Sequence, residues 1–185
     1  IVSLALGAVI LGLMRRPWAG QGRLVAAILA GCWLWVAWAF HWQRYATINW
    51  AAAYFAGAFA VEGLLLFWTG VIRNGLGVGS APSVAHRIGF GVVLFALAAQ
   101  PLLGPLVGRE WMQMEIFGVA PDPTVLATLG ILLATARRMR WELLVVPLLW
   151  CATSGAIAWT MGSPDALVMP LAALAIPIIA CARKP

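Results

Sequence analysis

The chain has 185 residues, of which 63% are hydrophobic and only 10% are charged. A soluble protein of this length would need far more charge to cover its surface, so the composition excludes a soluble globular domain and favours a polytopic membrane protein. The formal net charge of +6 would suggest nucleic acid as a partner in a soluble protein. No nucleic-acid-binding motif is present, and basic cytoplasmic loops that face anionic lipid explain the charge instead.

Seven apolar blocks follow one another along the chain. They are Ile1–Met14, Leu24–Phe40, Trp50–Ile72, Ile88–Val107, Thr124–Ala136, Trp141–Met161 and Ala166–Ala182. The third is long enough for a helix to cross the ~30 Å hydrocarbon core of a bilayer. The fifth is too short to span unless its flanks extend it, and the first is short because we expect residues to be missing before Ile1. The prediction is one all-α domain over residues 1–185, a transmembrane helical bundle of about seven spans.

The charge of the predicted loops alternates along the chain. With seven spans, ten of the twelve basic residues fall in the first, third and fifth loops and in the tail. These ten are Arg15, Arg16, Arg23, Arg73, Arg87, Arg137, Arg138, Arg140, Arg183 and Lys184. The intervening loops hold Arg44 and Arg109 together with the acidic residues Glu110, Glu115, Asp122 and Asp165. The positive-inside rule then predicts a cytoplasmic C-terminus.

A candidate polar layer surrounds Glu62, the only charged residue of the third block. At 1.5 Å per residue, Gln100, Thr153 and Ser154 lie at a similar depth in their own helices. One interpretation is a proton- or substrate-binding site in mid-membrane. The other is a protonated Glu62 that is hydrogen-bonded to Gln100 or to a backbone carbonyl and holds helices together. The sequence leaves both open.

A second candidate site is the outer face of the bundle. Its loops collect acidic residues and one imidazole, which could dock a partner protein or weakly bind a cation; a solvated surface is the alternative. The candidate contact residues are His41, Arg44, Glu110, Glu115 and Asp122.

No cofactor and no metal is predicted. The three cysteines have no metal-ligand or disulfide spacing, and no phosphate loop, nucleophile elbow or metalloprotease motif is present, so we expect the protein not to be an enzyme. Most of the eleven tryptophans fall near the expected membrane interfaces. Trp33, Trp35 and Trp150 lie deeper, where packing against other helices explains them, and contact with a pigment, quinone or lipid is the alternative.

Several short phrases resemble, in order and spacing, a bacterial multi-pass membrane family known as domain of unknown function 6064. They are His41, Ile48-Asn49, Phe117 to Pro121, Pro147 to Trp150 and Gly155-Ala156. The resemblance covers the chain from about Leu24 onward and implies a bacterial inner-membrane location with no established activity. The family usually has Pro-Cys-Pro where this chain has Pro121-Asp122-Pro123, and an amide in place of Glu62. The first departure argues against thiol or metal chemistry at that position.

Two functions from different classes are compatible with the sequence. The first is a non-catalytic accessory or scaffold subunit of a larger membrane complex, whose partners are the lipid bilayer and other membrane subunits. Spans with few polar residues favour it, as do small-residue stripes such as Ala52, Ala56 and Ala60 on the third helix, or Ala27 and Gly31 on the second. The alternative is a small-molecule or proton-linked transporter that uses Glu62.

Overall fold

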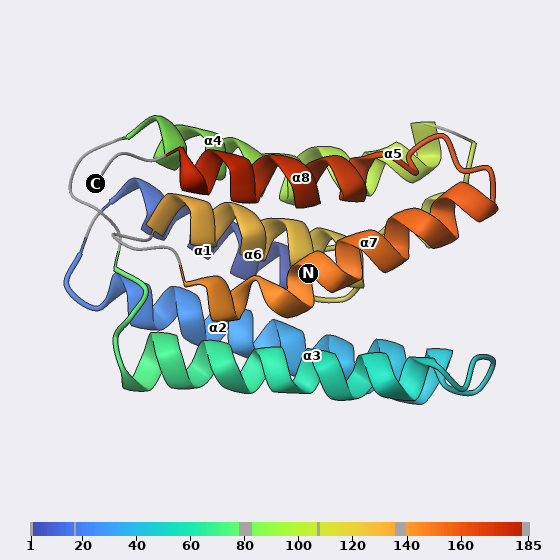
Figure 1. Ribbon diagram of the computed structural model, residues 1–185, viewed down its shortest axis with the longest axis horizontal. Coiled ribbons are helices and arrows are strands. Elements are labelled where there is room, and N and C mark those ends of the chain that lie inside the picture. The colour runs from blue at the N-terminus through green and yellow to red at the C-terminus, as the bar shows by residue number, and fades with distance from the viewer. Residues whose placement is uncertain (1, 17, 78–82, 107, 136–139, 183–185) are drawn as a thin grey trace.

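The computed structural model describes residues 2–16, 18–77, 83–106, 108–135 and 140–182 (Figure 1). Within these ranges the chain is helical and contains no strand. The main helices are α1 (Val2–Arg15), α2 (Gln21–Trp35), α3 (Ala52–Leu66), α4 (Val84–Leu94), α5 (Gln100–Leu106), α6 (Pro121–Thr135), α7 (Val145–Thr160) and α8 (Val168–Cys181).

Wider π-helical turns extend three of these helices without a break. They continue α2 to Tyr45, continue α3 to Ile72, and join α4 to α5 through Phe95–Ala99. The described helices therefore form seven rods that coincide with the seven apolar blocks, which confirms the all-α prediction. Four rods are long and apolar enough to cross a membrane: Gln21–Tyr45, Ala52–Ile72, Val84–Leu106 and Trp141–Thr160. The rods Val2–Arg15, Pro121–Ala134 and Val168–Cys181 are apolar but shorter.

Helix α6 forms the centre of the bundle. Every residue from Pro123 to Ala134 is buried, and the helix contacts α2, α4, α7 and α8. A helix that is apolar on all sides is stable in a protein core or in contact with lipid, and here other helices cover it. The fifth block can be short because other helices surround it.

Helices α4 and α6 approach each other through a pair of glycines. A Cβ atom added to Gly89 would lie 2.4 Å from the carbonyl oxygen of Gly130, and one added to Gly130 would lie 2.7 Å from the carbonyl oxygen of Gly89. Side chains cannot occupy that space, so both positions require glycine. This contact fixes α6, and the residues that begin it, against α4.

The close contact between α2 and α3 does not use the predicted stripe of Ala27 and Gly31. A Cβ added to Gly70 would lie 2.2 Å from the Cβ of Ala26, whereas Gly31 faces open space. The physical reason is helical phase, because a shift of one residue turns a side chain by about 100° around the axis.

The two ends of the bundle differ in charge. One end, on the left of Figure 1, holds the connections α1–α2, α3–α4 and α6–α7; the other holds α2–α3, α5–α6 and α7–α8. The first carries Arg15, Arg16, Arg23, Arg73, Arg87 and Arg140. The second carries the acidic loops, and Arg137, Arg138, Arg183 and Lys184 lie outside the described residues. Six of the eight arginines that the structure describes thus lie at one end, and Arg44 and Arg109 lie at the other, as the sequence pattern predicts.

Candidate functional site

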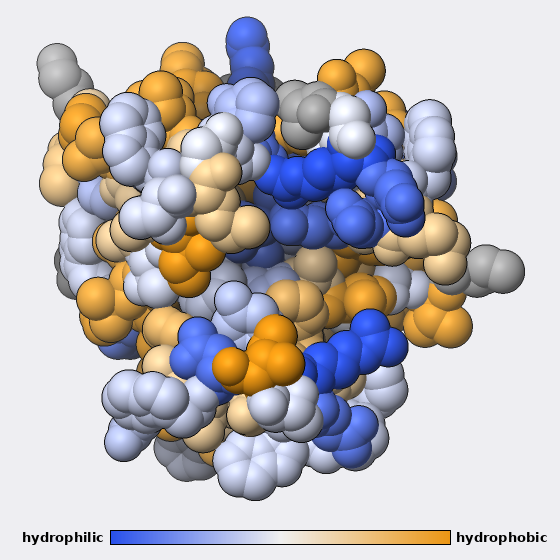
Figure 2. All heavy atoms as spheres, turned by 90° about the vertical axis from the view of Figure 1, so that its right-hand side faces the viewer, coloured by the Kyte–Doolittle hydropathy of each residue, from blue (hydrophilic) through white to orange (hydrophobic). Residues whose placement is uncertain are grey.

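A pocket of about 580 Å³ lies where α6 begins. Residues of α5, α7, α8, the end of the α2 rod and the loop before α6 line it. At this end of the bundle α7 extends beyond the start of α6 (Figure 1). Figure 2 looks onto this end and shows hydrophilic side chains gathered around a hollow.

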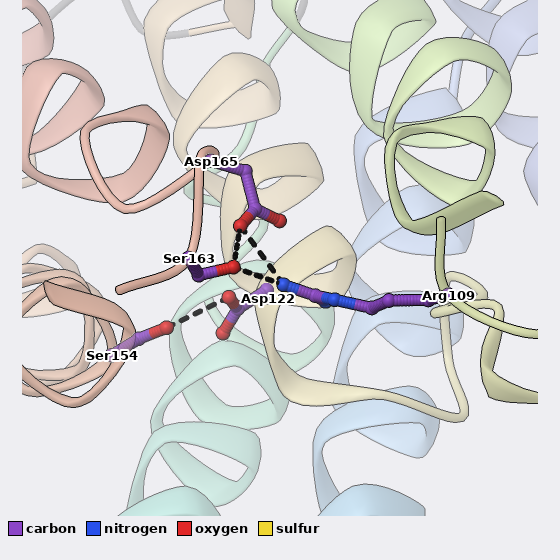
Figure 3. A network of polar contacts seen from close by, with 5 residues as sticks. All are labelled: Arg109, Asp122, Ser154, Ser163 and Asp165. Carbon is purple, nitrogen blue, oxygen red and sulfur yellow. Dashed lines mark hydrogen bonds and ion pairs between the residues drawn. The ribbon is translucent and has the colours of Figure 1, made fainter. Parts of the chain in front are cut away.

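Asp122 lies deep in this pocket, in the first turn of α6. Its Oδ1 accepts a hydrogen bond from Nε1 of Trp150, and its Oδ2 accepts one from Oγ of Ser154 (Figure 3), both at 2.7 Å. Both donors belong to α7, which ends only at Thr160. At 1.5 Å per residue, the carboxylate therefore lies about 9–15 Å inside the end of α7. The helix dipole of α6 also favours a negative charge at this position.

A second carboxylate, Asp165, lies nearer the mouth of the pocket. Nη2 of Arg109 donates to Oδ1 of Asp165 at 2.9 Å and also to the hydroxyl of Ser163, which itself donates to Asp165 (Figure 3). The Arg109 and Asp165 side chains are 33% and 22% exposed, so the ion pair faces water. It joins the loop after α5 to the turn between α7 and α8.

Glu115 adds a third carboxylate to the lining. Burial and the negative charges of Asp122 and Asp165 raise the pKa of Glu115, and Arg109 lowers it; together they bring the pKa to about 7. Three carboxylates and one guanidinium give a net charge of −2 when all are ionised. Of the three, only Asp165 makes an ion pair within the described residues. We call this pocket the acidic vestibule.

Gln100 contributes an unpaired acceptor. Its side chain lines the acidic vestibule and is only 7% exposed, and its Oε1 has no hydrogen-bond partner in the part of the chain that the structure describes. A buried amide oxygen without a donor costs about 1–3 kcal/mol. Protein atoms cover this oxygen, so water in the vestibule does not relieve that cost.

The predicted polar layer is only partly brought together. Gln100 and Ser154 both line the acidic vestibule, whereas Glu62 and Thr153 do not. The hydroxyl of Thr153 donates to the carbonyl of Leu149 in its own helix, at 2.9 Å. Glu62 is fully buried in α3, and neither of its oxygens has a hydrogen-bond partner among the described residues. The expected hydrogen bond from Glu62 to Gln100 or to a backbone carbonyl is not formed.

The expectation that His41 lies on the outer face is wrong. Its side chain is fully buried, with ring centroids 4.5 Å from Phe59 and 5.0 Å from Trp150. The α2 rod continues to Tyr45, so that α3 and α7 cover the imidazole inside the bundle. Of the other candidate contact residues, Arg44 and Glu110 are exposed, and Glu115 and Asp122 line the vestibule.

Arg109 was not among the predicted site residues, and Asp165 was predicted only as one of the acidic residues of the outer face. Their pairing joins positions 56 residues apart, which no local pattern indicates.

Of the three tryptophans predicted to lie deep, two donate hydrogen bonds within the protein and one is exposed. Trp33 donates to the hydroxyl of Thr128 at 2.8 Å and packs on Phe59, and Trp150 donates to Asp122. Trp35 is 52% exposed. No group of three or more His, Cys, Asp and Glu residues is arranged to hold a metal ion within the described ranges.

The described residues form a helical protein with an acidic vestibule at one end, and four of their helices are long and apolar enough to cross a membrane. A family model matches residues 1–184, and the chain therefore belongs to the Family of unknown function (DUF6064). This match confirms the resemblance and extends it to nearly the whole chain. No curated protein and no solved structure matches the chain.

Proposed function

We propose that this protein is a multi-pass protein of the bacterial inner membrane that binds a small solute in the acidic vestibule. The observation that carries the proposal is a pocket of about 580 Å³ that reaches a half-buried carboxylate, Asp122. Small-molecule sites typically have volumes of about 300–1,000 Å³ and few, well-placed polar groups. Binding of this kind is the first step of transport, and Asp122 replaces Glu62 as the carboxylate that contacts the solute.

The orientation follows from the charged ends of the bundle. Cytoplasmic loops of membrane proteins carry an excess of Lys and Arg. The arginine-bearing end therefore faces the cytoplasm, together with the C-terminus, and the acidic vestibule opens to the periplasm. A solute would enter from that side and meet the Arg109–Asp165 pair before it reaches Asp122.

The accessory-subunit function is a second proposal, and one observation favours it. Gly31 on α2 and Gly57 on α3 face open space, with no atom within 4 Å of an added Cβ. Small residues on a lipid-facing surface let another helix approach closely. Purification with mild detergent tests this proposal: stoichiometric partner chains should co-elute, and Gly31→Leu should reduce their recovery. A lone, monodisperse protein would contradict it. We propose no catalytic role.

Solute binding is tested by thermal unfolding of the purified protein in detergent, with small anions, neutral solutes and cations added in turn. At least one class should raise Tm with increasing concentration, because a ligand of the folded state stabilises it by mass action. The shift should be reduced in Asp122→Asn. It should persist in Glu142→Gln, which alters an exposed carboxylate at the opposite end. If no class shifts Tm, the proposed function is wrong.

Access from the periplasm is tested separately by labelling. Ser154→Cys, in a background with the exposed Cys181 changed to Ser, should react with a membrane-impermeant maleimide added outside spheroplasts. The background alone should react little, because Cys32 and Cys151 are buried. Labelling only from the cytoplasmic side would contradict the orientation.

A further inference from the structure

The carboxylate of Asp122 keeps free capacity to accept hydrogen bonds. Trp150 and Ser154 donate to it, and a carboxylate can accept about four hydrogen bonds, of which the structure shows two. A ligand that contacts Asp122 can therefore donate hydrogen bonds to it.

The charge of the lining selects the same kind of ligand. Arg109 pairs with Asp165, and neither Asp122 nor Glu115 has an ion-pairing cation among the described residues. A buried carboxylate without a counter-ion is costly, and a ligand with a positive charge removes that cost. An anion would add to the repulsion, and a neutral solute would leave it unchanged.

The shape of the site favours an organic cation over a bare metal ion. Within the ranges described, the acidic residues are not arranged as a metal-holding group. The pocket is also far larger than a metal ion, and Phe40, Tyr45 and Trp150 line it. Aromatic faces attract organic cations, and the hydrocarbon part of such a ligand is compatible with these walls.

We propose that the acidic vestibule binds a small protonated amine whose ammonium group donates hydrogen bonds to Asp122. This rests on the proposed function and adds the chemical class of the solute. A quaternary ammonium has the same charge but no N–H to donate, so the two cations separate the role of charge from the role of hydrogen bonding.

The experiment is calorimetric titration of the detergent-purified protein at pH 8 and constant ionic strength. The probes are n-butylammonium, tetramethylammonium, n-butanol, butyrate and Ca²⁺. We expect n-butylammonium to bind most tightly. Asp122→Asn should weaken it about ten- to a hundredfold, the effect of losing a hydrogen bond to a charged group, and Glu142→Gln should leave it unchanged.

The comparison of n-butylammonium with tetramethylammonium uses the unaltered protein, so it tests the contact even where Asp122→Asn changes folding. Unchanged affinity in Asp122→Asn, or equal affinity for tetramethylammonium, would overturn the proposed contact. Tighter binding of n-butanol, butyrate or Ca²⁺ would overturn the amine class but leave solute binding standing. Absence of binding by every probe, together with no Tm shift from any class of solute, would overturn both.

Discussion

Replacing Gly89 with alanine would place a methyl group in the close contact between α4 and α6. The added Cβ would lie 2.4 Å from the carbonyl oxygen of Gly130 and 2.7 Å from the backbone nitrogen of Ala134. Both are backbone atoms of α6, so neither can move without the helix. Overpacking of this kind costs about 1–3 kcal/mol, and contact with backbone places Gly89→Ala at the upper end of that range. The gain in helix propensity of about 1 kcal/mol leaves a net loss of about 2 kcal/mol.

Gly91→Ala is the matched control, because it lies on the same helix and a Cβ there meets no atom within 4 Å. It should gain about 1 kcal/mol from helix propensity alone, so that the two variants differ by about 3 kcal/mol. Unfolding in mixed micelles with increasing dodecyl sulfate, followed by tryptophan fluorescence, measures this difference. Equal stability of Gly89→Ala and Gly91→Ala would refute the apposition of α4 and α6, and with it the position of Asp122.

Three further predictions concern buried polar groups. The raised pKa of Glu115 means that its carboxyl group binds a proton more tightly in the folded state than in the unfolded state. The stability from this group should be fully present below pH 4.5 and should fall by on the order of 3 kcal/mol as the pH rises to about 7. Glu115→Gln should remove this pH dependence when unfolding is measured as a function of pH. Thr128→Val leaves the indole N–H of Trp33 unpaired and should lower the free energy of unfolding by about 1–3 kcal/mol. The control Thr153→Val loses only a hydrogen bond within its own helix and should cost much less. Equal losses in the two variants would contradict the Trp33 contact. Glu62→Leu removes a buried carboxyl group without a partner in the described chain and should raise the free energy of unfolding by about 1–3 kcal/mol. A loss of stability in the same unfolding assay would show that a group outside the described residues, or water, forms hydrogen bonds with Glu62.

The helices could be predicted from the sequence because each apolar block is a local signal. Blocks of about 20 apolar residues bounded by arginine or proline coincide with the rods. The enclosure of α6 does not follow from its block alone, because an apolar helix can also face lipid. Composition likewise identifies a small residue but not the phase at which two helices meet: Gly70 contacts Ala26, whereas Gly31 faces open space.

The acidic vestibule was less predictable, because its contacts join distant segments. Counting residues along each helix places Gln100 and Ser154 at one depth, and both do line the pocket. Depth alone does not distinguish one side of the bundle from the other, so Glu62 was grouped with them although it lies apart from the lining. The bonds from Trp150 and Ser154 to Asp122 span 28 and 32 residues, and only the folded chain reveals them.

The short central helix has an electrical consequence in the proposed orientation. If water fills the vestibule down to Asp122, the insulating path beneath it is about the length of α6, roughly 22 Å for its 15 residues. The transmembrane voltage would then fall mainly across that path, with about 2.3 kcal/mol per elementary charge for each 100 mV. With the cytoplasm negative, a cation leaving Asp122 inward would be pulled by almost the full voltage, although it would cross only part of the bilayer.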